Sequence, residues 1–102
     1  MEFKDKLDNG ICEVQVEGEL TIYHVNDFKS DLEKVIKKST SLKLDLSGVS
    51  EIDTSCVQLL MQAQDACLEN DKEFSISAVS PAVQEVIDIF GMHNHFITAK
   101  AG

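Results

Sequence analysis

Apolar residues along this chain recur with two different periods, and the period changes several times. Alternation at every second position is typical of half-buried strands, whereas spacings of three and four are typical of helices that bury one face. The alternating segments predict strands at residues 3–7, 12–16, 42–46, 74–78 and 96–99. The segments with helical spacing predict helices at residues 26–38, 54–69 and 81–90. The predicted order is therefore β-β-α-β-α-β-α-β.

Two dipeptides indicate where elements begin and end. Asn9-Gly10 separates the first two predicted strands and is typical of a tight hairpin turn, because both residues tolerate a positive φ. Ser80-Pro81 precedes the third predicted helix, with serine as the N-cap and proline at the first helical position. Gly91 is expected to end that helix.

The boundary between the second strand and the first helix is less sharply marked. Gly18 closes the clear alternation, and Leu20 and Ile22 extend the strand if a bulge or bend follows the glycine. Either Asn26 or Asp27 is expected to cap the first helix, since both side chains can accept a hydrogen bond from its first turn.

The alternation of strands and helices predicts an α/β fold. Strand–helix–strand units imply parallel pairing with right-handed crossovers in the second half of the chain. Three strands alternate apolar and polar residues, so one face of the sheet is expected to be wetter than the other. We therefore expect a mixed sheet of four to five strands, with the helices mainly on one face. A length of 102 residues suits a single domain spanning residues 1–102.

Charge narrows the range of partners. The chain has 18 acidic and 9 basic residues, a formal net charge of −9, which argues against binding to nucleic acid or to an anionic membrane surface. No apolar run approaches the roughly 18–20 residues needed to cross a bilayer. The amino-terminal residues lack an apolar signal core, so we expect a cytoplasmic protein, monomeric by default.

Cysteine and histidine spacing gives no sign of a metal or cofactor site. Cys12, Cys56 and Cys67 are odd in number and widely spaced, so reduced thiols are expected rather than disulfides or a zinc site. His93 and His95 are two residues apart, without a third ligand at a recognisable spacing. No glycine-rich nucleotide signature is present, and no cofactor is expected.

The candidate chemistry is at the turn between the third strand and the second helix. A short polar turn after residue 46 is expected to end at Asp53, which is a candidate N-cap. Thr54 and Ser55 follow, so two hydroxyl groups lie at a helix N-terminus. A phosphate placed there would meet backbone N–H groups and the positive end of the helix dipole. The turn is therefore a candidate chemical switch.

Three segments carry a family resemblance. The segment LDLSGVSEIDTSCVQLL resembles the signature of the STAS domain family, to which the bacterial anti-sigma factor antagonists (anti-anti-sigma factors) belong. SPAVQEVIDIFGMHNHF is similar to the carboxyl-terminal region of that family, and residues 16–20, VEGEL, are similar to its Gly-Glu-Leu after the second strand. Together the segments cover nearly the whole chain, in the family's order.

The resemblance implies a non-catalytic switch rather than an enzyme. In the family, the unphosphorylated protein binds an anti-sigma factor that is also a serine kinase, and phosphorylation releases it. By position, Asp53 matches the family aspartate, Ser55 the phosphorylated residue and Thr54 the preceding hydroxyl. Cys56 stands where the family usually has glycine. Residues 53–56 are thus the expected partner-binding residues, with Thr54 the second candidate for phosphorylation.

Two other functions remain open from the sequence. STAS domains also serve as accessory subunits of membrane transport ATPases, or in chemotaxis and stress signalling complexes. The other alternative is a thiol enzyme using Cys56, since a thiolate is stabilised in the first turn of a helix. His93 or His95 would then have to supply the base.

Overall fold

The computed structural model describes residues 1–89, and it follows the predicted order of elements through the third helix. The predicted strand at 96–99, the helix end at Gly91 and the histidines at 93 and 95 lie outside the described residues. The elements are β1 (Glu2–Asp8), β2 (Ile11–Leu20), α1 (Val25–Lys38), β3 (Ser41–Ile52), α2 (Thr54–Glu69), β4 (Glu73–Val79) and α3 (Pro81–Ile89).

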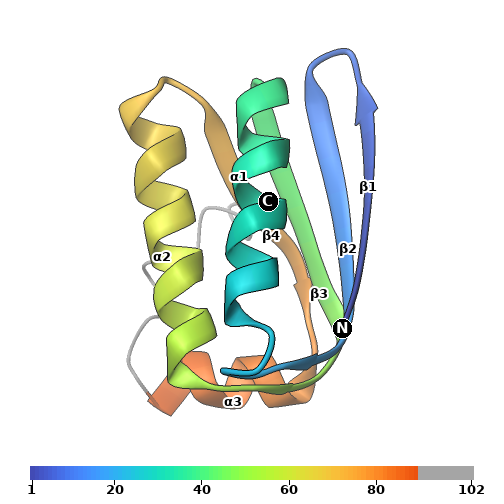
Figure 1. Cartoon of the computed structure of the whole chain (residues 1–102), viewed down its shortest axis with the longest axis vertical. Coiled ribbons are helices and arrows are strands. Elements are labelled where there is room, and N and C mark those ends of the chain that lie inside the picture. The colour runs from blue at the N-terminus through green and yellow to red at the C-terminus, as the bar shows by residue number, and fades with distance from the viewer. Residues whose placement is uncertain (90–102) are drawn as a thin grey trace.

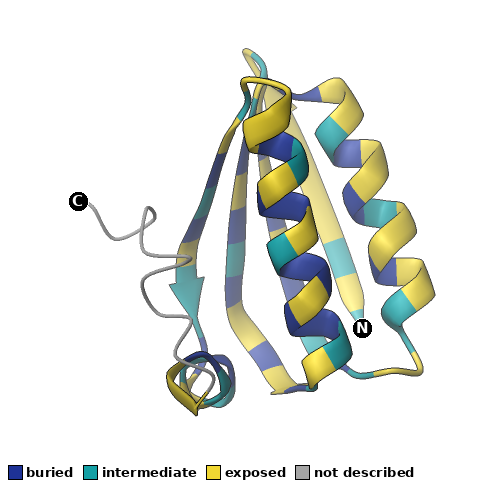
Figure 2. Ribbon diagram, turned by 90° about the vertical axis from the view of Figure 1, so that its left-hand side faces the viewer, coloured by how far each residue is buried: buried dark blue, intermediate teal, exposed yellow. Residues whose placement is uncertain are grey.

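The four strands form one mixed sheet in the order β1-β2-β3-β4. β1 is antiparallel to β2, whereas β2, β3 and β4 are parallel to one another. Each crossover helix joins neighbouring strands in the same direction across the sheet, so two right-handed crossovers place α1 and α2 on the same face. Figures 1 and 2 show this layer of two helices beside the sheet. The predicted α/β architecture is confirmed.

The hairpin between β1 and β2 has the predicted turn. Asn9 has a φ of 53° and Gly10 a φ of 84°, both in the left-handed region that a two-residue hairpin of this type requires. A β-carbon on Gly10 would lie 2.6 Å from Oγ1 of Thr40, so a larger residue would also clash there. The glycine therefore serves both the turn and the close approach of the next connection.

β3 is longer than predicted, and the expected polar turn after residue 46 is wrong. The strand continues to Ile52, and it advances from Asp45 to Gly48 while its partner β2 advances one residue fewer. This β-bulge and a second one between Val49 and Glu51 change the spacing of buried residues from two to three, giving Leu46, Val49 and Ile52. The loss of strict alternation explains why the sequence pattern resembled a turn.

The connection from β2 to α1 also differs from the prediction. β2 ends at Leu20, so Ile22 lies in a turn and not in the strand. α1 begins before the two predicted caps, because the carbonyl of His24 already accepts the first helical hydrogen bond. His24 is the N-cap residue but makes no side-chain cap hydrogen bond. Asn26 and Asp27 therefore lie inside the first turn of the helix.

The starts of the other two helices agree with the predictions. α2 begins at Thr54 and ends at Glu69, as the pattern predicted. α3 begins at Pro81, and the hydroxyl of Ser80 accepts a hydrogen bond from the backbone N–H of Val83 at 3.2 Å. These boundaries depend on local capping chemistry, which a sequence displays directly.

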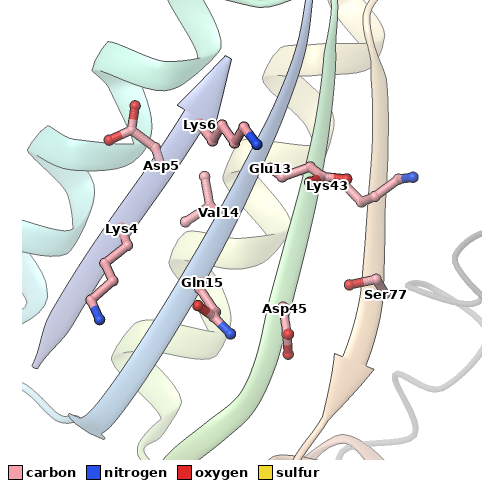
Figure 3. A pocket seen from close by; sticks show the side chains of 9 residues that line it. All are labelled: Lys4, Asp5, Lys6, Glu13, Val14, Gln15, Lys43, Asp45 and Ser77. Atoms are coloured by element: carbon pink, nitrogen blue, oxygen red, sulfur yellow. The ribbon is translucent and has the colours of Figure 1, made fainter. Parts of the chain in front are cut away.

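The face of the sheet opposite α1 and α2 carries polar side chains, as predicted. Lys6, Glu13 and Lys43 follow one another across β1, β2 and β3 in pairing register. They border a pocket of about 380 Å³ that also includes Asp45 and Ser77 (Figure 3). Because positive and negative groups alternate, this pocket has no marked preference for an anionic or a cationic ligand. It shares no lining residue with the candidate turn at 53–56.

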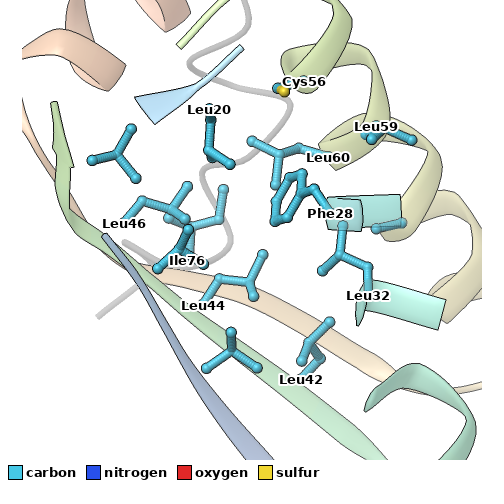
Figure 4. Close-up of a cluster of buried hydrophobic side chains, with 14 of the residues drawn as sticks. Leu20, Phe28, Leu32, Leu42, Leu44, Leu46, Cys56, Leu59, Leu60 and Ile76 are labelled. Carbon is cyan, nitrogen blue, oxygen red and sulfur yellow. The ribbon is translucent and has the colours of Figure 1, made fainter. Parts of the chain in front are cut away.

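The core lies between the sheet and the two helices (Figure 4). Leu42, Leu44 and Leu46 of β3 are fully buried and face Phe28 of α1 and Leu60 of α2. Their alternation with polar residues is the pattern that predicted the strand. This packing fixes α2 against β3, and so fixes where the first turn of α2 lies.

Candidate functional site

The residues of the predicted switch lie at the carboxyl end of the parallel strands, where β3 passes into α2. Asp53 is the single residue between Ile52, the last of β3, and Thr54, the first of α2. Figure 1 shows that the turn from β2 to α1 and the helix α3 lie at this same end of the molecule. Ligand and partner sites of α/β proteins are commonly built at this end of a sheet.

Asp53 is the N-cap of α2, as predicted, and its carboxylate also accepts a hydrogen bond from outside the helix. The residue is extended, with φ −113° and ψ 175°, so its side chain turns back toward the helix start. Oδ1 accepts hydrogen bonds from Oγ of Ser55 at 2.6 Å and from the backbone N–H of Cys56 at 3.3 Å. Oδ2 accepts a hydrogen bond from the backbone N–H of Ile22 at 2.7 Å. One carboxylate therefore joins the start of α2 to the β2–α1 connection.

These contacts set the charge state of Asp53. Burial of the carboxyl works to raise the pKa of Asp53. Hydrogen bonds donated by the Ser55 hydroxyl and by the backbone N–H groups of Ile22 and Cys56 outweigh burial and hold the pKa below its ordinary value of 3.8. The group is therefore an anion at neutral pH, and its oxygens act only as acceptors.

The two hydroxyl groups at the helix start differ in their surroundings. Ser55 is half-buried and donates to Asp53, so its oxygen is held in one place. Thr54 is exposed. The N-cap carboxylate of Asp53 is the acidic group at this end of α2, and the first turn itself contains no further acidic side chain. Of the two, Ser55 is the oriented hydroxyl.

Cys56 is fully buried, and it does not itself reach the surface. Its Sγ donates a hydrogen bond to the carbonyl of Thr21 at 3.6 Å. Burial, followed by the charge of Asp53, raises the pKa of Cys56 to about 11. The thiolate that the helix position suggested is therefore disfavoured, which argues against the thiol-enzyme hypothesis.

The replacement of the family glycine by Cys56 introduces no backbone strain. Within residues 1–89, the residues other than glycine with a positive φ are Asn9 and Asp71. Cys56 thus has an ordinary helical conformation, and glycine's wider conformational range is not needed at this position.

A pair of exposed apolar residues lies beside the candidate turn and was not predicted from the sequence. Ile22 and Tyr23 lie in the β2–α1 connection and are 64% and 89% exposed. We call residues 21–24 the docking turn. Two adjacent large side chains of this kind, both exposed to water, make Ile22 and Tyr23 candidates for contact with a partner. The available signal was that both residues follow the strand but precede the helical spacing.

The surroundings of the docking turn are acidic. Glu19 of β2 pairs with Glu51 of β3 across the sheet, and both side chains are exposed just before the strands end. Opposed like charges repel, so basic groups on a partner would be favoured at this position.

Residues 1–89 contain no group of three or more His, Cys, Asp or Glu side chains that could hold a metal ion. None of the helices in that range combines the length and apolar character needed to span a membrane.

The lowered pKa of Asp53 predicts a specific pH dependence of stability. Because the folded-state pKa lies below the unfolded value, the stabilisation is present above about pH 3.8 and is lost as pH falls through the folded-state pKa. Asp53→Asn should lower the free energy of unfolding at neutral pH by about 1–2 kcal/mol, because the amide keeps one acceptor oxygen and places an NH2 group where the second oxygen accepts a hydrogen bond. Urea unfolding should show this difference shrinking below about pH 4.

The matched control is Asp65→Asn, an exposed aspartate on the same helix. It should change the free energy of unfolding by less than about 0.5 kcal/mol at every pH. A deficit of Asp53→Asn that is as large in acid as at neutral pH would contradict the assigned role of the carboxylate.

The buried position of Cys56 predicts slow alkylation. A pKa of about 11 in place of 9.0 lowers the thiolate fraction at about pH 8 roughly hundredfold, and burial slows the reaction further. Iodoacetamide followed by peptide mass spectrometry should show Cys56 protected in the folded chain. In denaturant Cys56 should react as fast as Cys12 and Cys67. Preferential modification of folded Cys56 would restore the thiol-enzyme hypothesis.

Comparison with known proteins agrees with this fold. The family model described as Mlab, STAS domain matches residues 5–98. An anti-sigma factor antagonist from Mycobacterium paratuberculosis has a TM-score of 0.83 and 20% sequence identity, over 93% of this chain and 81% of that one.

Two structures of SpoIIAA are also similar. The unphosphorylated anti-sigma factor antagonist SpoIIAA has a TM-score of 0.78 and 18% identity, over 91% of this chain and 84% of that one. The phosphorylated form, described as a Bacillus cell fate determinant, has a TM-score of 0.73 and 17% identity, over 91% and 86%. No curated protein sequence matches the chain. The family match spans most of the sequence, and the chain belongs to the STAS domain family.

Proposed function

We propose that this chain is a non-catalytic signalling module of the anti-sigma factor antagonist type. It binds an anti-sigma factor that is also a serine kinase, and it is switched by phosphorylation at Ser55. The observation that carries the proposal is the oriented hydroxyl of Ser55, held 2.6 Å from Asp53 at the start of α2. The similarity to SpoIIAA, a protein with phosphorylated and unphosphorylated structures, supports it.

The proposed contact surface combines the helix start with the docking turn. Asp53, Thr54 and Ser55 supply polar groups, and Ile22 and Tyr23 supply apolar area. Cys56 was predicted to be a contact residue. It is buried, and it contacts the docking turn through the hydrogen bond from its Sγ to the carbonyl of Thr21. An apolar centre with a polar and acidic border suits a partner that has an apolar pocket bordered by basic residues.

Phosphorylation would make this surface unfavourable for binding. The γ-phosphoryl group of ATP forms a bond to Oγ of Ser55, the hydroxyl proton passes to the kinase and ADP leaves. The product carries roughly −1.5 to −2 charges and three acceptor oxygens. Burying such a group unpaired beneath a partner costs several kcal/mol, and each 1.4 kcal/mol lowers affinity about tenfold. Asp53 and the exposed Glu51 add repulsion.

A second candidate is an accessory subunit of a membrane transport ATPase, or of a chemotaxis or stress complex. The description of the matching family model names Mlab rather than sigma factor control, which favours keeping this candidate. The same surface would then dock with or without phosphorylation. In either case we place the chain in the cytoplasm as a monomer before it binds.

The assignment of Ser55 predicts the outcome of a labelling experiment. The wild-type chain, Ser55→Ala and Thr54→Ala are incubated with ATP and the anti-sigma factor kinase of the same organism. Intact-mass spectrometry should show one phosphoryl group on the wild type and on Thr54→Ala, and none on Ser55→Ala. A label that survives Ser55→Ala would refute the assignment, and loss in Thr54→Ala alone would move it to Thr54.

The docking turn predicts a different result for two equally exposed apolar residues. Ile22 is 64% exposed, and Leu68, near the opposite end of α2, is 61% exposed. In the unphosphorylated chain, Ile22→Ser should weaken binding to the partner about tenfold or more, as expected for an interface residue whose truncation costs over 1 kcal/mol. Isothermal titration should show no change for Leu68→Ser. Equal effects of the two variants would exclude the docking turn from the interface.

A further inference from the structure

The carboxylate of Asp53 joins the phosphorylation candidate to the docking turn through its two oxygens. Oδ1 accepts from the hydroxyl of Ser55 at 2.6 Å, and Oδ2 accepts from the backbone N–H of Ile22 at 2.7 Å. Ile22 lies 31 residues before Asp53 in the sequence, in a different connection. A change at the Ser55 oxygen therefore has a direct physical route to the backbone that presents Ile22 and Tyr23.

The position of the docking turn depends on contacts with residues 53 and 56. The backbone N–H of Asp53 donates to the carbonyl of Leu20 at 3.0 Å, and Sγ of Cys56 donates to the carbonyl of Thr21 at 3.6 Å. Within the turn, the backbone N–H of His24 donates to the carbonyl of Thr21 at 2.8 Å, while the side chain of His24 makes no cap hydrogen bond to α1. The bond from Asp53 to Ile22 is the one that involves a charged group, and such bonds are the stronger kind.

A phosphoryl group on Ser55 changes both features that hold this carboxylate. The hydroxyl proton that Oδ1 accepts is replaced by the phosphoryl group, so the 2.6 Å hydrogen bond is lost. A multiply charged anion then stands beside an ionised carboxylate, and like charges at such short range repel strongly. The two oxygens of the carboxylate are fixed relative to each other, so turning Oδ1 away from the phosphate also displaces Oδ2 from the N–H of Ile22.

We propose that Asp53 couples the state of Ser55 to the docking turn, so that phosphorylation releases Ile22 and Tyr23 from the position in which a partner binds them. This inference rests on the proposed function, because phosphorylation of Ser55 is its trigger. It adds a second cause of release to the charge placed in the interface. The unphosphorylated protein presents an ordered apolar pair, and the phosphorylated protein presents the same pair on a loosened turn.

The test is amide hydrogen exchange at Ile22, measured by NMR on the chain alone. The samples are the unmodified chain, chains with phosphoserine at Ser55 or phosphothreonine at Thr54 incorporated during translation, and the variants Asp53→Ala and Asp53→Asn. Phosphorylated Thr54 is the matched control, since it adds the same charge one residue away without replacing the donor to Asp53. The amide of Ser80, which donates to the carbonyl of Leu46 at 3.2 Å, is the internal reference.

Phosphoserine at Ser55 should raise the exchange rate at Ile22 about tenfold or more, which corresponds to losing one hydrogen bond to a charged group. Asp53→Ala should have a similar effect and Asp53→Asn a smaller one, because the amide side chain keeps one acceptor oxygen. Phosphothreonine at Thr54 should leave Ile22 within about twofold of the unmodified chain, and Ser80 should not change in any sample.

Unchanged exchange at Ile22 in the chain phosphorylated at Ser55 would overturn the coupling. Equal acceleration by phosphate at Thr54 would also overturn it, because the effect would then come from charge at the helix start rather than from the contact with Asp53. No kinase or partner is used. If the kinase does not label Ser55, the proposed function fails, but the coupling measured by hydrogen exchange still stands. If exchange at Ile22 does not change, the coupling fails, but phosphorylation of Ser55 by the kinase still stands.

Discussion

The arrangement of the candidate site depends on one ionised carboxylate at the start of α2. Asp53 accepts from the N–H of Cys56, from the N–H of Ile22 and from the hydroxyl of Ser55. The contacts with Ser55 and Cys56 are partly buried, and a donor left there without a partner costs up to about 1–3 kcal/mol, so few other side chains would satisfy the three donors together. The helix start, the docking turn and the oriented hydroxyl are consequences of this one acceptor.

The sheet brings these groups together because β2 and β3 end side by side. Leu20 and Ile52, the last residues of the two strands, are paired in the parallel register. The register shifts twice along the pair, and each shift adds one residue to β3. The bulges therefore align the strand ends, and Asp53 leaves the sheet next to Thr21 and Ile22.

Features fixed by neighbouring residues were predictable from the sequence, and features fixed by pairing between distant segments were not. The bounds of α2, the Asn9-Gly10 turn and the N-cap at Asp53 depend on local capping and turn chemistry, and all were predicted. The length of β3 and the place of Ile22 were not, because a bulge and a hydrogen bond across 31 residues decide them. The hydrogen bond from the N–H of Ile22 to Asp53 has no corresponding pattern in the sequence.

The carboxylate of Asp53 also explains why the proposed switch favours the unphosphorylated arrangement of the site over the phosphorylated one. A phosphate at a helix N-terminus gains only about 0.3–1 kcal/mol from the dipole at an exposed site. Beside Ser55, this gain is opposed by an anion whose pKa is held low by the very contacts that order the site. The charge that stabilises the unphosphorylated arrangement is thus the charge that makes the phosphorylated arrangement strained, and no large rearrangement of the core is needed to distinguish the two.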